Sequence, residues 1–417
     1  MTSGMSAADA AVFFDGSRLT LARQLAAMRK SDLAQTIGKS PTVVAGWESG
    51  SKRPTASTVA ELALGLGIDP GFFAVRQEDV AALTSTPHFR SLRATTQLAR
   101  DQARAYGQLS VDIAASLERY VELPDLNIPY FPVDLDDAES CGPEQAARFI
   151  REHWQMGSGP AGHLVRLLEN HGVLVVFSPP QTAAVDAYSF DSHLRPVVVL
   201  NPSKQDYYRQ RFDVAHELGH LVMHADAEPG SRIVEEQANR FASELLMPAD
   251  EIFDLLPSKM SSNVWGLLAK LKEQWGVSMQ ALLFRARKLG KLNDVSYRNA
   301  MTTVSARGWR RSEPGQVRIL EQPSLLPKAI ELLGGEGIEE QTLIDECRVP
   351  RELFRDATAR APQALANMAT SEKPLDDRDS RRVVSLLPRL EQAKTAKDVP
   401  EDLSEQLDYE GERNGGN

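Results

Sequence analysis

The sequence has little of what a membrane or exported protein needs. Among its 417 residues, no apolar run approaches the length of about 18 residues that a membrane-spanning helix requires, so we expect no membrane partner. The opening residues, MTSGMSAADAAVFFDG, lack a basic segment followed by a long apolar one, so we expect no signal peptide. Only two cysteines occur, Cys141 and Cys347, and their wide separation favours two free thiols in a reducing compartment. These absences together predict a cytoplasmic protein.

The chain as a whole also lacks a net positive charge. The formal net charge is −10, which by itself argues against a nucleic-acid partner. Residues 17–60 reverse this balance, because they contain seven basic and two acidic side chains. A phosphate backbone meets the local charge rather than the total charge, so this basic stretch is the candidate for a nucleic-acid contact.

The basic stretch shows the pattern of four short helices. The expected helices cover residues 17–27, 32–37, 41–47 and 59–67. Ser31 and Ser40 are the expected N-caps of the second and third helices, and Ser57 or Thr58 begins the fourth. Gly38 ends the second helix. Two short helices joined by a glycine turn are typical of a helix-turn-helix, with the third helix as the recognition helix.

Particular residues within this pattern carry a resemblance. They are Leu33-Ala34, Gly38, Trp47-Glu48-Ser49-Gly50, Arg53-Pro54 and the apolar fourth helix. With them, the stretch resembles the Cro/repressor (xenobiotic-response-element) class of DNA-binding domains. The resemblance implies double-stranded operator DNA as a partner, with Trp47 in the core and Glu48 as a buried polar brace. The implied DNA contacts are Ser40, Thr42 and Val43 at base edges, Gln35 at the backbone or first base, and Lys39, Lys52 and Arg53 at phosphates. A four-helix protein-binding module with a solvated basic face is the alternative.

Residues 76–125 form the next segment, which is helical in composition. Charges alternate there on an alanine and leucine scaffold up to Tyr120. This pattern predicts a solvated helical pair that separates the DNA-binding module from the next domain. A role in forming a homodimer is the alternative. Pro124, Pro129 and Pro132 then place a domain boundary between residues 120 and 140.

The central part of the chain combines a small sheet with a motif typical of zinc sites. We expect helices at 144–154 and 162–170, and strands at 172–177, 187–190 and 196–201. The next helix contains His216-Glu217-x-x-His220. Two histidines four residues apart point the same way from a helix and can hold one zinc ion, with Glu217 beside them to take a proton from water.

A catalytic zinc needs a third protein ligand. His224 lies about 12 Å along the helix axis from His216, and no glycine turns the chain between them, so we expect it to brace the helix end instead. On the following helix, Glu235 shares the side that faces the core, whereas Glu236 is rotated toward solvent. We therefore expect Glu235 as the third ligand, and Asn239, one turn later, to orient it or a ligating histidine.

The same residues carry a second resemblance. Arg211-Phe212-x-x-Ala215-His216-Glu217-Leu218-Gly219-His220 is followed by Glu235-x-x-Ala238-Asn239-x-Phe241-Ala242-x-x-Leu245-Leu246-Met247-Pro248. This pattern resembles the ImmA/IrrE family of zinc metallopeptidases. The resemblance implies a gluzincin-like site, with His216, His220 and Glu235 holding Zn2+ (Mn2+ is the alternative metal) and Glu217 as general base. The oxyanion helper stays open among His224, Tyr188 and Tyr207.

The resemblance also implies a class of substrate. A stand-alone member of the family cleaves a separate Cro-class repressor and so releases genes for a stress response or a mobile element. Here both halves lie on one chain, so the substrate is left open between a repressor, an antitoxin-like partner and the chain itself. The alternative function is a transcription regulator whose peptidase-like domain is a non-catalytic sensor or dimer scaffold.

The expected fold class is α+β and mostly helical. The expected parts are an all-α helix-turn-helix domain at 15–75, a helical linker at 76–125, a zincin-like domain with a small sheet at 126–290, a helical C-terminal domain at 291–397 and an acidic, disordered tail at 398–417. An amphipathic helix is expected at 275–289. The role of the C-terminal domain is open between a ligand-sensing or docking module and a stabilising appendage.

Overall fold

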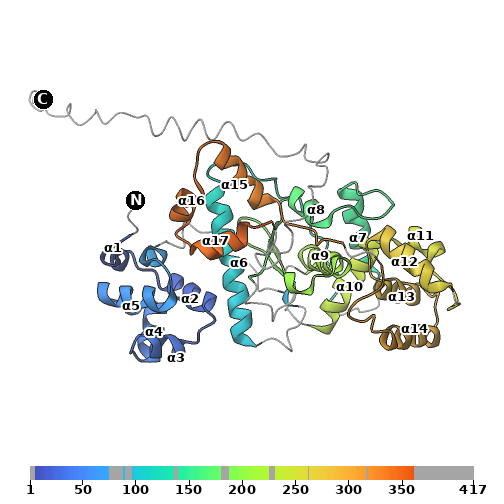
Figure 1. The fold of residues 1–417 in the computed structure, drawn as a ribbon, viewed down its shortest axis with the longest axis horizontal. Coiled ribbons are helices and arrows are strands. Elements are labelled where there is room, and N and C mark those ends of the chain that lie inside the picture. Colours follow the sequence, from blue (N-terminus) through green and yellow to red (C-terminus); the bar gives the residue numbers. More distant parts are fainter. Residues whose placement is uncertain are drawn as a thin grey trace, which may run out of the picture.

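The computed structural model describes residues 5–74, 88–89, 96–135, 140–179, 187–224, 231–261, 263–315 and 318–360. Helices dominate this part of the chain, and one small sheet lies between the N-terminal helices, drawn in blue, and helices α9 and α10 (Figure 1). The mostly helical α+β fold class is therefore confirmed. The tail expected at 398–417 and the end of the region expected at 291–397 lie outside the described residues. None of the described helices is long and apolar enough to cross a membrane.

The N-terminal helices form one compact group. Its elements are α1 (Ala7–Val12), α2 (Gly16–Leu25), α3 (Lys30–Thr36), α4 (Pro41–Glu48), α5 (Ala56–Leu66) and the 3-10 turn η1 (Pro70–Ala74). As expected, Ser40 precedes α4 and Pro41 takes its first position. Gly38 has a φ of 63°, a left-handed conformation that glycine adopts at little cost, and it turns the chain between α3 and α4.

Two of the expected helix starts are wrong. Helix α3 begins at Lys30 and not after Ser31, because the Asp32 carboxylate accepts the backbone N–H of Arg29 at 2.9 Å and so caps the helix two residues earlier. Helix α5 begins at Ala56, since the Thr55 hydroxyl accepts the N–H of Thr58. The residues expected to begin this helix therefore lie inside its first turn.

Helix α6 (Gln97–Leu117) corrects the expectation of a solvated helical pair. It is a single helix, and more than half of its residues are buried. On one side, its Asp112 carboxylate pairs with the buried Arg18 of α2 at 2.5 Å. On the other side, Gly107 lies so close to Phe190 that a Cβ atom would be 2.0 Å from the ring. The alternating charges were misleading because small residues between them allow neighbours to pack closely on both sides.

A four-stranded sheet packs against α6. Its strands are β1 (His88–Phe89), β2 (Leu174–Phe177), β3 (Tyr188–Phe190) and β4 (Val197–Leu200), in the order β1-β3-β4-β2. Strands β2 and β4 are parallel, and β3 is antiparallel to both β4 and β1. The three longer strands lie close to the ranges expected at 172–177, 187–190 and 196–201.

The sheet separates two hydrophobic cores, because alternate residues of a strand face opposite sides. Leu174 and Val176 belong to a core that also contains the N-terminal helices, α6 and the C-terminal helices. Val175 and Phe177 belong to a second core, with the helices that follow the sheet. The core that contains the DNA-binding candidate and the core that contains the peptidase candidate therefore lie on opposite faces of one sheet.

The helices of the second core include the one that carries the motif histidines. They are α7 (Gly142–His153), α8 (Leu164–Asn170), α9 (Tyr207–Met223), α10 (Arg232–Leu246), α11 (Ala249–Ile252), α12 (Val264–Trp275), α13 (Met279–Lys288) and α14 (Asp294–Ala306), with the 3-10 turns η4 (Pro202–Lys204) and η5 (Phe253–Leu255). The helix expected at 275–289 is present as α13, but it begins four residues later than expected. Gly276 has a φ of 64° and ends α12, and Ser278 then caps α13.

Three more helices return to the first core. They are α15 (Leu325–Gly335), α16 (Glu340–Cys347) and α17 (Arg351–Thr358), which lie beside α6 in Figure 1. The segment that leads to them crosses the second core, where Glu321 is buried against α9. The C-terminal helices therefore pack in the first core, and the segment before them packs against the second.

Candidate functional site

Helix α9 is held in place before it reaches the motif. Its first turn is capped by Asp206, whose side chain accepts the N–H groups of Tyr208 and Arg209. Arg211 is only 2% exposed, and it donates to the carbonyl oxygens of Ala161 and Gly162 at 2.7 and 2.6 Å. It also forms a buried ion pair with Glu321. These bonds fix the helix five residues before His216.

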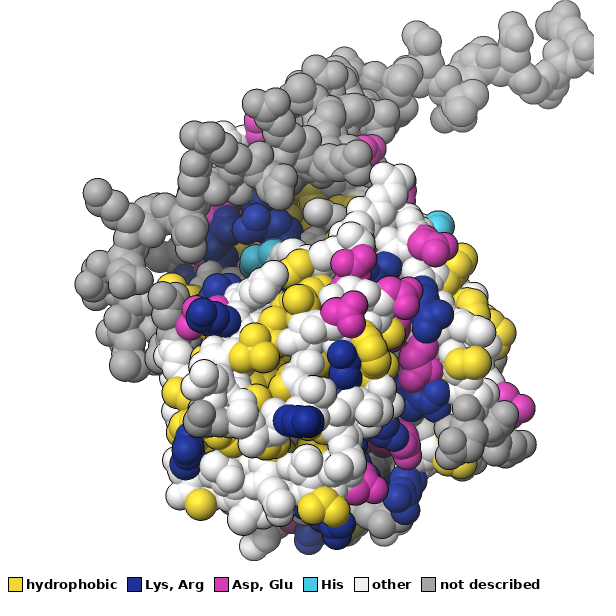
Figure 2. Space-filling view, turned by 90° about the vertical axis from the view of Figure 1, so that its right-hand side faces the viewer, with side chains coloured by type: hydrophobic (Ala, Val, Ile, Leu, Met, Phe, Trp, Pro, Cys, Tyr) yellow, Lys and Arg dark blue, Asp and Glu magenta, His cyan; other side chains and the backbone are white. Residues whose placement is uncertain are grey.

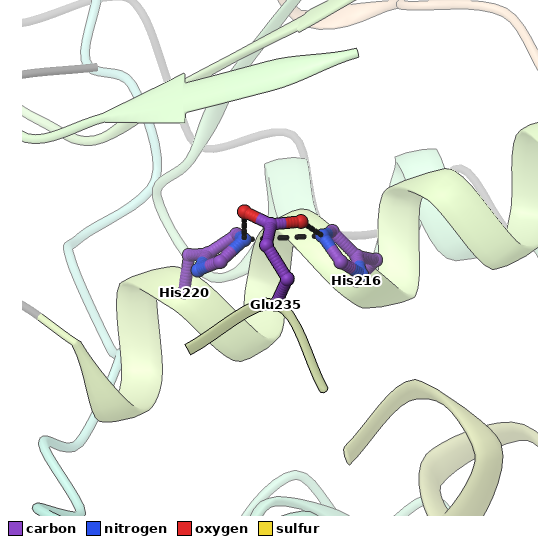
Figure 3. Close-up of side chains that lie close together, drawn as sticks. All are labelled: His216, His220 and Glu235. Atoms are coloured by element: carbon purple, nitrogen blue, oxygen red, sulfur yellow. Dashed lines mark hydrogen bonds and ion pairs between the residues drawn. The ribbon is translucent and has the colours of Figure 1, made fainter. Parts of the chain in front are cut away.

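The motif histidines meet one carboxylate of the next helix. The ligand atoms of His216, His220 and Glu235 all lie within 4.8 Å of one another. The two Nε2 atoms are 3.1 Å apart, and the Glu235 oxygens lie 3.4 Å from Nε2 of His216 and 3.6 Å from Nε2 of His220. In Figure 3 the Glu235 carboxylate faces both rings from α10. Both imidazoles are buried, while the Glu235 side chain is 19% exposed.

These separations fit a zinc ion. With bonds of about 2.0–2.1 Å to nitrogen, a tetrahedral zinc holds neighbouring donor atoms about 3.3 Å apart. The separation of 3.1 Å between the two nitrogens and the distances from the nitrogens to the two Glu235 oxygens, 3.4 Å from His216 to Oε2 and 3.6 Å from His220 to Oε1, surround that value. Two imidazole nitrogens and one carboxylate oxygen are also the donor types that zinc prefers, and three protein ligands leave a fourth position for a reactant. The other carboxylate considered, Glu236, is exposed and pairs with Lys288 at 3.2 Å, outside this cluster.

Each histidine has a second partner at its other ring nitrogen, Nδ1. Nδ1 of His216 lies 3.1 Å from Oδ1 of Asn239, and Nδ1 of His220 lies 3.1 Å from Nδ1 of His224. The structure thus brings both expected supporting residues to the cluster. His224 follows the last residue of α9 and is not one of the three clustered groups, as its position along the helix predicted.

Glu217 is fully buried beside the cluster, and its carboxylate contacts β3. The Ser189 hydroxyl donates to Oε2 of Glu217 at 2.7 Å, and both residues are 0% exposed. Sequence reasoning missed Ser189. The available signal was a single polar residue between Tyr188 and Phe190, in a strand that is otherwise apolar.

Two of the three candidates for the oxyanion helper, Tyr188 and Tyr207, have side chains that make other contacts. Tyr188 belongs to the core on the opposite side of the sheet and donates to the carbonyl oxygen of Ala103 at 3.0 Å. Burial raises the pKa of this hydroxyl above its usual value. The Tyr207 ring packs against the guanidinium groups of Arg211 and Arg318 at the start of α9. These contacts argue against both tyrosines as oxyanion helpers.

A cavity opens at the exposed side of the cluster. It has a volume of about 1120 Å³ and is lined by Glu235 and Asn239 of α10, Phe212 of α9, Phe284 of α13 and neighbouring residues. Arginine, lysine, aspartate and glutamate side chains all contribute to its lining. On the face at the α11–α14 end of the molecule, both signs of charge are likewise interspersed, with hydrophobic side chains between them (Figure 2). The cavity therefore offers a substrate both charged and apolar contacts.

The residues expected to contact DNA lie around α4. Most of them are exposed: Gln35, Lys39, Ser40, Thr42, Lys52 and Arg53. Val43 differs, because it is partly buried against the first core. Trp47 is buried, and the Glu48 side chain is 5% exposed and pairs with Arg23 at 2.5 Å and Lys30 at 3.1 Å. Glu48 thus braces the helices from inside.

Comparisons with known proteins agree with both parts. Residues 19–73 match the family model described as helix-turn-helix, and residues 168–287 match the one described as IrrE N-terminal-like domain. The first match contains α4 and its neighbours, and the second contains the whole His216, His220 and Glu235 cluster. No curated protein matches the chain. The two matches confirm the fusion that the motifs indicated.

Proposed function

Because the chain joins a helix-turn-helix domain to an IrrE N-terminal-like peptidase domain, we propose that it is a DNA-binding transcription regulator with a zinc-dependent endopeptidase activity. The DNA-binding part is assigned to residues 15–75 and the peptidase to residues 126–290. The observation that carries the peptidase assignment is the meeting of His216, His220 and Glu235 at zinc-like separations, next to the buried Glu217.

The roles of the chain's own groups follow from this arrangement. His216, His220 and Glu235 would hold the ion. When bound, zinc would polarise the scissile carbonyl and lower the pKa of water toward about 7. Glu217 takes the proton of the attacking water and returns it to the leaving amine. Ser189 holds one carboxylate oxygen of Glu217, and the burial of both groups strengthens this contact by excluding water.

Strand pairing at the edge of β3 favours a substrate that binds as an extended peptide. His88 and Phe89 pair there as an antiparallel strand with Ser189 and Tyr188. Since Ser189 also contacts Glu217, a strand on this edge runs beside the proposed general base. The paired residues belong to the segment between the two domains, which favours the chain itself among the substrates considered. A Cro-class repressor with an extended segment would have to displace this strand to use the same edge.

The peptidase assignment is tested by incubating the purified chain with Zn2+ or Mn2+, alone and with Cro-class repressors. Fragment termini are identified by mass spectrometry, with Glu217→Gln as the matched variant. We expect metal-dependent cleavage that falls about 10²–10⁴-fold in the variant, because a general base contributes about that much. Equal cleavage by the variant would contradict the role of Glu217. Tight operator binding without any cleavage would instead support the non-catalytic sensor or scaffold.

The DNA-binding assignment rests on the exposed side chains around α4. Lys39, Lys52 and Arg53 would contact phosphates, and Ser40 and Thr42 would read base edges. A homodimer would present two such helices to half-sites about one helical turn apart. Sedimentation of the chain with and without operator DNA measures whether two copies bind together.

A further inference from the structure

We propose that Gln237 and His224 form a buried hydrogen-bond relay that sets which ring nitrogen of His220 carries the proton, and thereby presents Nε2 of His220 to the metal. The inference rests on the proposed metal site. It assigns Gln237 as a positioning residue that acts through His224. It also extends the site to a loop outside helices α9 and α10, because the relay ends on the backbone of Asp134.

The orientation of the Gln237 amide is the first step. Its Nε2 group donates to the carbonyl oxygen of Asp134 at 2.7 Å. The amide oxygen therefore faces the opposite way, and Oε1 lies 2.9 Å from Nε2 of His224. A carbonyl oxygen accepts hydrogen bonds and cannot donate them. Nε2 of His224 must therefore carry the proton in this contact.

The proton positions of both histidines follow from that step. A neutral imidazole has one N–H group and one lone pair. With its proton on Nε2, His224 has the lone pair on Nδ1, which lies 3.1 Å from Nδ1 of His220. Only one of these two atoms can donate, so Nδ1 of His220 carries the proton. Its Nε2 lone pair then points into the cluster with His216 and Glu235.

Burial makes the relay selective. His220, His224 and Gln237 are each 1% exposed, so bulk water has little access to replace a missing partner. A buried donor or acceptor left without a partner costs about 1–3 kcal/mol. The reversed tautomer of His220 would place two lone pairs against each other at Nδ1 and would turn an N–H toward the ion. The relay therefore favours the one tautomer that can bind metal.

The loop that ends the relay is itself attached to α9. The N–H of Phe131 donates to the carbonyl oxygen of Val222 at 2.9 Å, two residues before His224. The Asp134 carbonyl is thus held near the C-terminal end of the same helix that supplies both histidines. By contrast, His216 is oriented in one step by Asn239. Nδ1 of His220 instead contacts His224, which in turn contacts Gln237 of α10, so two bonds orient the second histidine.

Zinc affinity tests the relay without any substrate. Gln237→Leu removes the acceptor of His224 and the bond to Asp134, and we expect it to weaken zinc binding about 10–100-fold in competition with a chelator at pH 7. Gln237→Glu keeps the acceptor, and its affinity should lie closer to wild type. The matched control is Gln210→Leu, because Gln210 is also a buried glutamine with two hydrogen bonds, both to the backbone of Glu321. This control should leave zinc affinity unchanged within about threefold.

The outcomes separate the relay from the proposed function. If Gln237→Leu and Gln210→Leu destabilise the metal-free protein equally and neither changes zinc affinity, Gln237 is only structural and the relay is wrong. A second measurement uses the wild-type chain, so it does not depend on whether a variant folds. Nitrogen-15 NMR of the histidine-labelled, metal-free chain should show the proton of His220 on Nδ1 and that of His224 on Nε2. The opposite tautomers would overturn the relay, whereas correct tautomers and zinc binding without proteolysis would overturn the proposed peptidase activity alone.

Discussion

The salt dependence of DNA binding can be predicted quantitatively, because the structure shows which basic side chains are exposed and can contact phosphates. Of the seven basic residues between 17 and 60, Arg18 and Arg23 are buried in ion pairs with Asp112 and Glu48. Lys30 also pairs with Glu48. The other four are exposed: Arg29 lies at the N-terminal end of α3, and Lys39, Lys52 and Arg53 lie beside α4. We expect the three side chains beside α4, the recognition helix, to contact phosphates.

The magnitude follows from counterion release. Each phosphate contact contributes about 0.9 to the slope of log affinity against log salt concentration, so three contacts contribute about 2.7 for each bound copy. Replacing Lys39, Lys52 and Arg53 by alanine should flatten the slope by that amount. Between 50 and 200 mM salt, wild-type affinity should then fall about 40-fold more than that of the triple variant.

Fluorescence anisotropy with operator DNA, repeated over a salt series, measures this slope. The matched control is Lys270→Ala, an exposed lysine on α12, at the opposite end of the molecule from α4 in Figure 1. We expect the control to keep the wild-type slope. An unchanged slope in the triple variant, or an equal loss in the control, would refute the assignment of α4 and its flanks as the DNA-contacting surface.

Three further predictions concern stability, thiol chemistry and metal removal. Glu321→Ala removes the carboxylate that pairs with the buried Arg211, so urea titration should show a free energy of unfolding about 3–5 kcal/mol lower, whereas the exposed Glu331→Ala should change it by less than about 1 kcal/mol. Burial raises the pKa of Cys347 to about 11, and Cys141 is exposed, so a thiol reagent at pH 8 should label Cys141 alone until the chain is unfolded; rapid labelling of both would contradict the burial of α16. Chelation of zinc should lower the melting temperature, because a ligand at 100 times its Kd stabilises the folded state by about 2.7 kcal/mol, and no change would argue against a bound ion.

The features that could be predicted from the sequence are local ones. Helical geometry places His216 and His220 on one face, and the same rule points Glu235 inward and Glu236 outward. The structure shows this arrangement because the spacing along a helix is set by the backbone. The glycine turn at Gly38 could be predicted for a similar reason, since its left-handed φ suits glycine.

The features that could not be predicted depend on contacts between distant segments. Ser189 reaches Glu217 across 28 positions of the sequence, and Arg211 reaches Glu321 across 110. No spacing rule connects such pairs. Helix α6 was misjudged because its charges suggested solvent, whereas its burial depends on neighbours at both ends of the chain. The Gln237 amide shows its role only when the Asp134 carbonyl and His224 are both in place.

The most direct test of the account compares two neighbouring carboxylates in a zinc-binding measurement. Glu235 contacts both histidines, whereas Glu236 pairs with Lys288 outside the cluster. Wild type and Glu236→Ala should each bind one zinc ion per chain with similar affinity, and Glu235→Ala should bind at least 100-fold more weakly, since it loses a ligand. Zinc binding that survives in Glu235→Ala, or that is lost in Glu236→Ala, would contradict the metal centre proposed for this protein.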